Sequence, residues 1–183
     1  VASAILQAEP GATIIYNLIC SRVVAEVIAE QGGRAVRSRV GHSFVKVAMA
    51  SEGAAFAGEH SGHYYFRDNF GADSGIIAAL LVLEALSTHD GPLSDLVAPF
   101  DHYAASGEIN FEADDPGAAL DTVAAFYAGH PQDRLDGLTV DAGDWWLNLR
   151  TSNTEPLLRL NLEAGHHAAC AERVTEVRGL LGQ

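Results

Sequence analysis

The first ninety residues alternate short apolar runs with segments of helical periodicity, and this alternation constrains the fold more than any other feature of the sequence. The run TIIYNL at 13–18 is typical of a strand, and the apolar residues of 23–28 follow it at helical spacing. The alternation predicts further strands at 35–37 and 54–57, and further helices at 44–49 and 76–86. Because strands separated by helices form parallel sheets covered by helical layers, we predict a three-layer α/β domain with a mostly parallel sheet.

Candidate caps mark where two of these helices begin. Ser21 precedes the helix that contains 23–28, and Asp73 and Ser74 precede the helix at 76–86. The second of these helices, IIAALLVLEAL, is apolar nearly all round. We therefore expect it to be buried in a layer that flanks the sheet.

Strand-rich sequence follows a segment of turn-forming residues at 88–107. Strands are expected at 107–113, on both sides of an Asp/Ala/Gly turn within 136–149, and at 157–163, with helices at 116–127 and 168–181. In LLRLNLE, the residues Leu158, Leu160 and Leu162 alternate with polar residues, which is the pattern of a strand with one buried face. This order of elements predicts a small α+β domain with an antiparallel sheet.

The change of pattern divides the chain. We predict an α/β domain at 1–104 and an α+β domain at 105–183, with a hinge near residues 100–108, where the architecture changes and Gly107 occurs. The chain begins with Val1 in a helix-like segment and has no initiator Met, so we expect it to be cut from a longer protein.

The composition limits the partners that such a chain can have. Eleven basic residues against twenty-four acidic ones give a net charge of −13, which repels nucleic acids and anionic bilayers. The sequence has no run of eighteen apolar residues, so neither a nucleic-acid nor a membrane partner is expected. Cys20 and Cys170 lie far apart and lack the spacing of a disulfide framework or zinc site, which favours a reducing, cytoplasmic location.

A first polar motif, GEHSGH, occupies residues 58–63. Glu59, Ser61 and His63 alternate, so an extended backbone would project all three side chains to one side. A carboxylate accepts two hydroxyl protons, while a serine hydroxyl and an imidazole donate or accept, so the three can bind the vicinal hydroxyls of a sugar. His42, in VGHS, can join them from the preceding loop. The alternative is a polar strand end whose side chains cap backbone groups.

The same region offers the ligand types of a metal site. His42, Glu59, His60 and His63 could form a zinc or iron set, as in a metal-dependent hydrolase. However, His60 and His63 are three residues apart in a glycine-bearing loop and lack the helical HExxH framework. We therefore predict that this chain has no metal ligands.

A second polar motif, RTSNTEP at 150–156, lies between two expected strands. The guanidinium of Arg150 can bind two oxygens of a phosphate, and Ser152, Asn153 and Thr154 add hydroxyl or amide donors in a tight turn. The alternative is an Asx or Ser/Thr turn that closes a hairpin. In so acidic a chain, a phosphate site must be an isolated pocket of directed donors.

Together the two motifs resemble those of a known family. GEHSGH is similar to the sugar-binding GExSGH loop, and RTSNTEP to the phosphate-binding R-x-SNTEP loop, of the α-D-phosphohexomutases, the family of phosphomannomutases and phosphoglucomutases. The flanking sequences VGHSFVK, YYFRDNFGADSG and WWLNLRTSNTEPLLRLNLEA are similar as well. The resemblance covers essentially the whole chain but only the C-terminal half of such an enzyme. It implies the third, α/β domain and a smaller fourth α+β domain of TATA-binding-protein-like topology.

The resemblance also implies an activity. Such an isomerase, an intramolecular phosphotransferase, interconverts hexose 6-phosphate and hexose 1-phosphate, of mannose or glucose, through a phosphoserine and a bisphosphorylated sugar intermediate. In the family the phosphoserine lies in the first domain, and an aspartate-rich loop of the second binds Mg²⁺. Neither a TASHNP-like nor a DGDGDR-like loop occurs in this chain, so we expect N-terminal domains as partners and an inactive isolated fragment. The alternative is a stand-alone sugar-phosphate-binding module.

By resemblance, each residue of the two motifs has a role. Glu59 and Ser61 would hold the ring hydroxyls, and His63, with His42, would contact the substrate and take part in proton transfer. The expected clamp on the nonreacting phosphate consists of Arg150, Ser152, Asn153 and Thr154. Glucose and mannose share their 3- and 4-hydroxyls, so these residues do not select between the two sugars.

The chain departs from the family at one position. Many members carry a D-x-K motif where this sequence has YNLICSR, so Ile19 stands where the family lysine is expected. A proton-transfer role for that lysine therefore does not carry over, and Arg22 is the candidate substitute.

Overall fold

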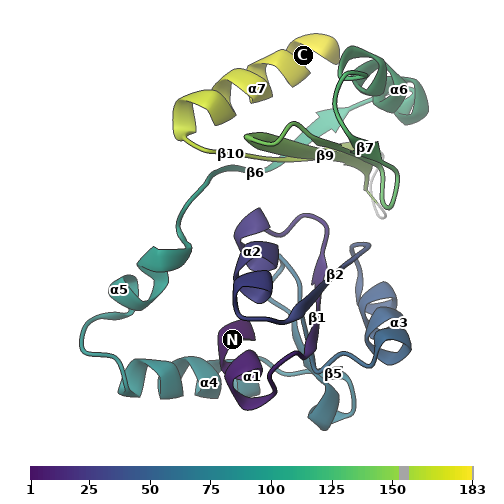
Figure 1. The fold of residues 1–183 in the computed structure, drawn as a ribbon. Coiled ribbons are helices and arrows are strands. Elements are labelled where there is room, and N and C mark those ends of the chain that lie inside the picture. The colour runs from purple at the N-terminus through teal and green to yellow at the C-terminus, as the bar shows by residue number, and fades with distance from the viewer. Residues whose placement is uncertain (153–156, 183) are drawn as a thin grey trace. The chain divides into compact units, whose positions relative to one another are not determined.

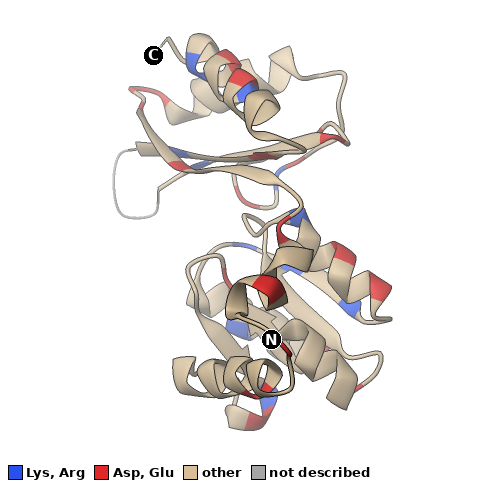
Figure 2. Ribbon diagram, turned by 90° about the vertical axis from the view of Figure 1, so that its left-hand side faces the viewer, with Lys and Arg blue, Asp and Glu red and all other residues tan. Residues whose placement is uncertain are grey.

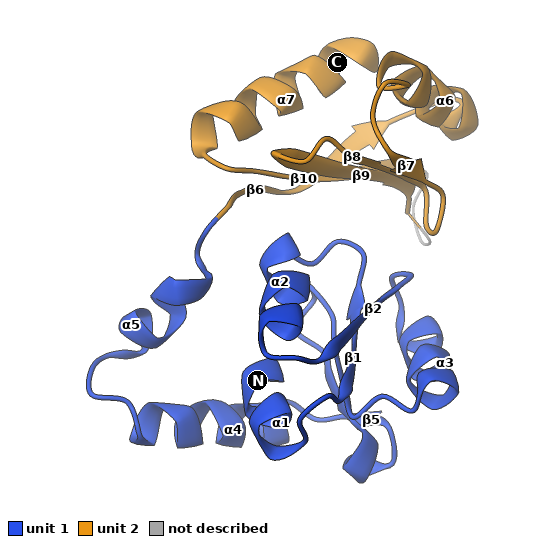
Figure 3. Ribbon diagram, viewed as in Figure 1, with its two compact units in different colours: residues 1–102 blue, residues 103–183 orange. Residues whose placement is uncertain are grey.

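The computed structural model describes residues 1–152 and 157–182, and the chain divides into two compact units, Val1–His102 and Tyr103–Gln183 (Figure 3). The N-terminal unit contains a mixed sheet with helices on both faces, and the C-terminal unit contains an antiparallel sheet. The predicted fold class, an α/β domain followed by an α+β domain, is confirmed.

The sheet of the N-terminal unit has the order β2-β1-β3-β4-β5. Its central strand, β1, pairs in parallel with both β2 and β3, whereas β4 and β5 extend the sheet with antiparallel pairings. The strands are β1 Thr13–Asn17, β2 Arg34–Ser38, β3 Phe56–Gly58, β4 Tyr64–Phe66 and β5 Ala72–Asp73. The helices are α1 Ala2–Ala8, α2 Arg22–Glu30, α3 His42–Glu52, α4 Gly75–Ser87 and α5 Leu93–Val97, with 3₁₀ turns η1 Arg67–Asn69 and η2 Ala98–Phe100.

Successive residues of the strands feed two separate hydrophobic clusters, because neighbouring side chains on a strand point to opposite faces. Ile14 and Phe56 pack with residues of α1, α2 and α4, whereas Ile15 and Ala57 pack with Val45 of α3. The helices accordingly lie as two layers, with α1, α2 and α4 on one side of the sheet and α3 on the other (Figure 1).

The expectation that α4 is buried in a layer flanking the sheet holds for only one face of the helix. Ala78 packs inward, but the side chains of Ile76, Leu80 and Leu83 are 76%, 60% and 58% exposed. Their spacing places them on one face of the helix. A single sheet can cover only one side of a flanking helix, and α4 carries more apolar surface than that contact buries.

The sheet of the C-terminal unit has the order β6-β10-β9-β8-β7 with every pairing antiparallel. Its strands are β6 Ala104–Glu112, β7 Gln132–Asp133, β8 Leu138–Asp141, β9 Trp145–Thr151 and β10 Leu157–Ala164, and its helices are α6 Pro116–Phe126 and α7 His167–Leu180. Both helices cover the same face of the sheet (Figure 1). Leu158, Leu160 and Leu162 lie in the core on this face, as the strict alternation predicted.

Alternate residues of the same strands give the opposite face of this sheet a polar character. Asn148 and Arg150 of β9 lie on it, beside Arg159 and Asn161 of β10, their direct partners in the strand register. The strand β9 ends with Arg150 and Thr151, so this polar face ends where the second motif of the sequence begins.

The helix caps expected from the sequence are present. The Ser21 Oγ accepts a hydrogen bond from the Val23 N–H at 3.3 Å, and the Ser74 Oγ accepts from the Ile77 N–H at 3.2 Å. In the C-terminal unit the Asp115 carboxylate caps α6, which begins with proline.

Acidic side chains lie on helices of both units, α2 and α7 among them, in keeping with the net charge of −13 (Figure 2). Within the described part of the chain, no helix combines the length and the apolar character needed to cross a membrane.

Candidate functional site

Residues 59–63 form the turn of a tight hairpin between β3 and β4, not the extended segment expected from the alternation of the motif. The Glu59 N–H donates to the His63 carbonyl at 2.9 Å, and the Gly62 N–H donates to the Glu59 carbonyl at 2.9 Å. Because β3 and β4 pair antiparallel, the turn brings Glu59 and His63 opposite each other at its mouth. Glu59 and His63 therefore lie close together as expected, but because the chain reverses direction between them and not because the segment is extended.

Glu59 is only 6% exposed, and three hydrogen-bond donors hold its buried carboxylate. Its Oε1 accepts from the Tyr65 hydroxyl at 2.6 Å, and its Oε2 accepts from the Gly41 N–H at 3.2 Å and the Asn17 amide at 3.4 Å. Donors of this kind offset the cost of removing a charged carboxylate from water. The carboxylate is therefore fixed in place before any ligand arrives.

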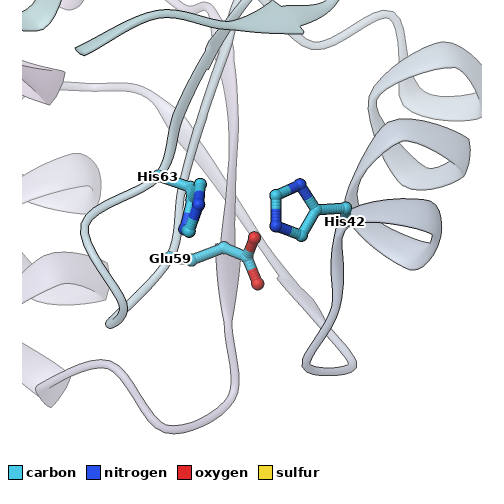
Figure 4. Close-up of side chains that lie close together, drawn as sticks. All are labelled: His42, Glu59 and His63. Atoms are coloured by element: carbon cyan, nitrogen blue, oxygen red, sulfur yellow. The ribbon is translucent and has the colours of Figure 1, made fainter.

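The two histidines lie beside this carboxylate (Figure 4). His42 is the first residue of α3, and the centroids of its ring and the His63 ring are 4.4 Å apart in an edge-to-face arrangement. Ser61 Oγ and His63 Nδ1 are hydrogen-bonded at 3.0 Å. The structure thus brings together the sequence-predicted residues His42, Glu59, Ser61 and His63.

Gly41 allows His42 to begin α3 at this point. Its φ of 128° lies in the region that favours glycine, and its N–H is the one that reaches Glu59. The same short segment therefore supplies a hydrogen-bond donor to the carboxylate and the imidazole beside it.

The metal-binding alternative keeps three of its four candidate ligands. The ligating atoms of His42, Glu59 and His63 lie within 4.8 Å of one another, so these three side chains could hold a metal ion. The fourth candidate, His60, is exposed and is not a member of this group. Hydroxyl groups, which need both donors and acceptors, suit the mixture of carboxylate, imidazole and serine better.

Three residues that the sequence analysis missed support Glu59: Asn17, Gly41 and Tyr65. Burial, and then the hydrogen bond to Glu59, raise the pKa of the Tyr65 hydroxyl, so that it remains a donor at neutral pH. A sequence signal for Tyr65 was available. Successive side chains of a strand point to opposite faces, and the middle residue of β4, Tyr65, lies on the face of the sheet that carries α3.

The residues at the D-x-K position of the resembling family are uncharged in this chain. Asn17 is 1% exposed, and its Oδ1 accepts hydrogen bonds from the His60 N–H at 3.3 Å and the Cys20 thiol at 3.1 Å. Ile19 is buried among the core residues, and Arg22, the candidate substitute, begins α2. Asn17 therefore ties the end of β1 to the hairpin through hydrogen bonds alone.

The second motif lies in the C-terminal unit, at the end of β9. The side chain of Arg150 is 4% exposed, and its Nη2 is 3.1 Å from Oε2 of Glu108. The Ser152 N–H donates to the Leu157 carbonyl at 2.8 Å. Asn153 and Thr154, the other expected phosphate ligands, lie outside the described residues.

Comparison with known families assigns both units. Residues 1–103 match the model of the phosphoglucomutase/phosphomannomutase alpha/beta/alpha domain III, and residues 108–180 match that of the phosphoglucomutase/phosphomannomutase C-terminal domain. These matches confirm the resemblance found in the two motifs and their flanks.

Individual relatives agree. A phosphomannomutase of Methanocaldococcus jannaschii is 39% identical over 100% of this chain and 41% of its own length, and one of Escherichia coli K12 is 42% identical over 89% of this chain and 36% of its own. The crystal structure of a phosphoglucomutase/phosphomannomutase family protein from Burkholderia thailandensis superposes with a TM-score of 0.85 at 32% identity, covering 98% of this chain and 39% of that one. The chain thus spans well under half the length of these relatives. It belongs to the phosphoglucomutase/phosphomannomutase family and corresponds to that family's domains III and IV.

Proposed function

We propose that this chain is the substrate-recognition half of a phosphohexomutase, an isomerase that interconverts the 6-phosphates and 1-phosphates of mannose, glucose or both. The observation that carries the proposal is the fixed Glu59 carboxylate at the mouth of the hairpin, with His42, Ser61 and His63 around it, in a chain of this family. A carboxylate has about four acceptor sites, so one that three donors already hold in place is preorganised to accept a further hydrogen bond from a sugar hydroxyl.

The α/β domain at 1–104 binds the sugar in this proposal. Glu59 and Ser61 hold the ring hydroxyls, and His63, with His42, contacts the substrate and serves in proton transfer. Ser61 supports the role of His63 because its hydrogen bond to Nδ1 leaves Nε2 of the same ring available to the substrate. Positioning of this kind is the main contribution a protein makes to phosphoryl transfer.

The α+β domain at 105–183 binds the nonreacting phosphate. Arg150 offers a charged, planar donor set for phosphate oxygens, and Ser152 follows it just after the end of β9. Asn153 and Thr154 complete the proposed clamp. Once the phosphoserine has given its phosphoryl group to the sugar phosphate, the bisphosphorylated intermediate has to reorient and return its other phosphate to the free serine, so one clamp serves the substrate in two orientations.

The reactive groups belong to the other half of the enzyme in this proposal. The phosphoserine and an aspartate-rich Mg²⁺ loop would lie in N-terminal domains, and Mg²⁺ bound there would neutralise charge on the transferred phosphoryl group. The group formed by His42, Glu59 and His63 does not fit Mg²⁺, which prefers an octahedral set of oxygens. Among the described residues, Cys20 and Cys170 form no disulfide, in keeping with the reducing cytoplasm that we propose as the location.

The proposal is tested by an isotope-edited NMR titration of this chain with mannose 6-phosphate, glucose 6-phosphate and inorganic phosphate. We expect the hexose phosphates to shift the amides of residues 58–63 and 150–152, and inorganic phosphate to shift only the second group. Arg150→Ala is expected to abolish the shifts of residues 150–152 with hexose phosphate and with inorganic phosphate. The control Glu52→Gln, on the exposed side of α3, should leave these shifts unchanged.

Two results would overturn the proposal. One is the absence of any shift at millimolar hexose phosphate, which would deny this chain a recognition role. The other is turnover of hexose phosphate by this chain alone, which would show that it is not half of the catalytic machinery.

A further inference from the structure

Two arginines lie side by side on the polar face of the C-terminal sheet. Arg150 of β9 and Arg159 of β10 are direct partners in the antiparallel register. Like charges directly opposite each other in a sheet repel and destabilise the pair. A third charged group is therefore needed to hold both guanidinium groups on this face.

Glu108 of β6 supplies that group. Its Oε2 is 3.1 Å from Nη2 of Arg150, and its Oε1 is 3.1 Å from Nη1 of Arg159, so one carboxylate bridges both guanidinium groups. The Arg150 side chain is almost fully buried, whereas those of Glu108 and Arg159 retain moderate exposure. A buried guanidinium is costly without a partner of opposite charge, and Glu108 provides it.

One of the five N–H donors of Arg150, the Nε–H, is buried and has no hydrogen-bond partner among the residues that the structure describes. Unsatisfied buried donors are uncommon in native proteins, and a guanidinium carries five N–H donors in a rigid fork. With Nη2 directed at Glu108, the buried Nε–H is the donor that an oxygen of a ligand would satisfy once it reached this face.

We propose that Glu108 is the positioning residue for Arg150, an inference that rests on the proposed phosphate-binding role of that arginine. Glu108 fixes the plane of the guanidinium by binding Nη2 and leaves the Nε–H for a phosphate oxygen. It also compensates one of two adjacent positive charges, so that Arg150 is not driven off the face by Arg159. Glu108 itself does not touch the phosphate.

A carboxylate next to a phosphate-binding arginine could act in the opposite sense, by competing with phosphate for the guanidinium. The two roles predict opposite signs. If Glu108 positions Arg150, its removal weakens phosphate binding. If Glu108 competes, its removal strengthens it.

The test compares Glu108→Gln and Glu108→Asp with Glu172→Gln in this chain. Glu172 lies on α7 and forms an exposed ion pair with Arg173, so its variant removes the same charge without touching Arg150. The first readout is the side-chain Nε–H signal of Arg150 in ¹⁵N NMR spectra without ligand. The second is the dissociation constant for mannose 6-phosphate, measured by titration.

We expect Glu108→Gln to shift and broaden the Arg150 Nε–H signal before any ligand is added and to weaken mannose 6-phosphate binding about 10-fold, or about 1.4 kcal/mol. Glu108→Asp retains the charge with a shorter reach and should recover part of both effects. Glu172→Gln should change neither. Unchanged backbone amide shifts of Leu158 and Leu160 would show that the sheet is intact in each variant.

An Arg150 signal unchanged in Glu108→Gln, or binding that is unchanged or tighter, would overturn the inference. Failure of the proposed function looks different. In that case the unsubstituted chain does not bind mannose 6-phosphate at all, while the ligand-free Arg150 signal still reports whether Glu108 holds the guanidinium.

Discussion

At the scale of single residues, the site depends on the side-chain amide of Asn17, at a position where a carboxylate would repel Glu59. Asn17 Nδ2 lies 3.4 Å from Glu59 Oε2, and both residues are buried. The amide donates to the carboxylate and carries no charge. Two carboxylates at this distance would repel each other strongly, because little water is present to screen them.

We therefore predict that Asn17→Asp lowers the free energy of unfolding by about 2–4 kcal/mol at pH 7, through loss of a donor and gain of a like charge. Asn17→Ala, which removes the donor without adding charge, should cost about 1–2 kcal/mol. Urea unfolding of both variants at pH 7 and pH 4.5 measures the difference. An Asp variant no less stable than the Ala variant at pH 7 would contradict the predicted repulsion.

The sequence predicted which side chains form the sugar-binding candidate, but not how they are held. GEHSGH concentrates a carboxylate, a hydroxyl and an imidazole in one short segment, so Glu59, Ser61 and His63 could be identified from residue type and spacing. The groups that hold Glu59 belong to Asn17, Gly41 and Tyr65, which are separated from it by 42, 18 and 6 residues in the sequence. No local pattern records such contacts, because they depend on how the strands pair.

At the scale of elements, the close approach of one loop fixes the backbone of β9 next to Arg150. Gly137, which precedes β8, has a φ of +70°. A Cβ atom at this position would lie 2.6 Å from both the Cα and the Cβ of Arg150. Glycine is thus required here for two separate reasons, backbone conformation and space.

Gly137→Ala is accordingly predicted to lower the free energy of unfolding by about 2–4 kcal/mol, because strain at positive φ adds to a collision with the backbone. The matched control is Gly143→Ala, at a φ of +89° with nothing within 4 Å of the added Cβ, which should cost about 1 kcal/mol. Chemical denaturation of both variants provides the comparison. An equal decrease in the free energy of unfolding in both variants would show that the close approach of Gly137 to Arg150 does not affect stability.

A second comparison of elements contrasts β10 with α4. Leu160 of β10 is fully buried, so Leu160→Ala should cost about 2–5 kcal/mol, whereas Leu83→Ala on the exposed side of α4 should cost less than about 1 kcal/mol. Thermal or urea unfolding of the two variants tests this contrast. Comparable destabilisation by both would mean that α4 is covered in solution.

The same two elements show what periodicity can predict. Leucine and polar residues alternate strictly in β10, so its buried face followed from the sequence. The helix α4 is apolar on all sides, so its sequence held no information about which face meets the sheet. Its orientation is set by packing against the sheet, which places Ala78 inward and Leu80 and Leu83 outward.

At the scale of the whole molecule, each unit contains a buried tyrosine bound to a carboxylate. The Tyr65 hydroxyl donates to Glu59 and the Tyr127 hydroxyl donates to Glu176, both at 2.6 Å. Burial is the largest cause of the raised pKa of each phenol, and the hydrogen bond to the carboxylate adds to it. Both units therefore keep a neutral phenol where the unfolded chain would ionise.

This arrangement predicts a loss of stability in alkali. Below the ordinary tyrosine pKa of 10.0, both phenols are protonated in the folded and unfolded chains alike. Above it, the unfolded chain releases protons that the folded chain retains, so the free energy of unfolding falls by up to about 1.4 kcal/mol per pH unit for each phenol. Urea unfolding at pH 9 and pH 10.5 measures the decline.

Single substitutions assign the effect to its unit. Tyr65→Phe should reduce the alkaline loss of the N-terminal unit, and Tyr127→Phe that of the C-terminal unit. Burial also raises the pKa of the Tyr16 phenol and of the Cys170 thiol, so each unit keeps a smaller alkaline loss after its substitution. A slope that neither substitution changes would place the titrating groups elsewhere in the chain.

The position of β1 between two hydrophobic clusters has an evolutionary consequence. Ile14 belongs to the cluster of α1, α2 and α4, while its neighbour Ile15 belongs to that of α3. A mutation that changes side-chain volume on one face can be compensated by a second mutation on that face. The packing of the other cluster is then unchanged. The packing of the layer that contains α3 and His42 can therefore change by mutation while the packing of the opposite layer stays the same.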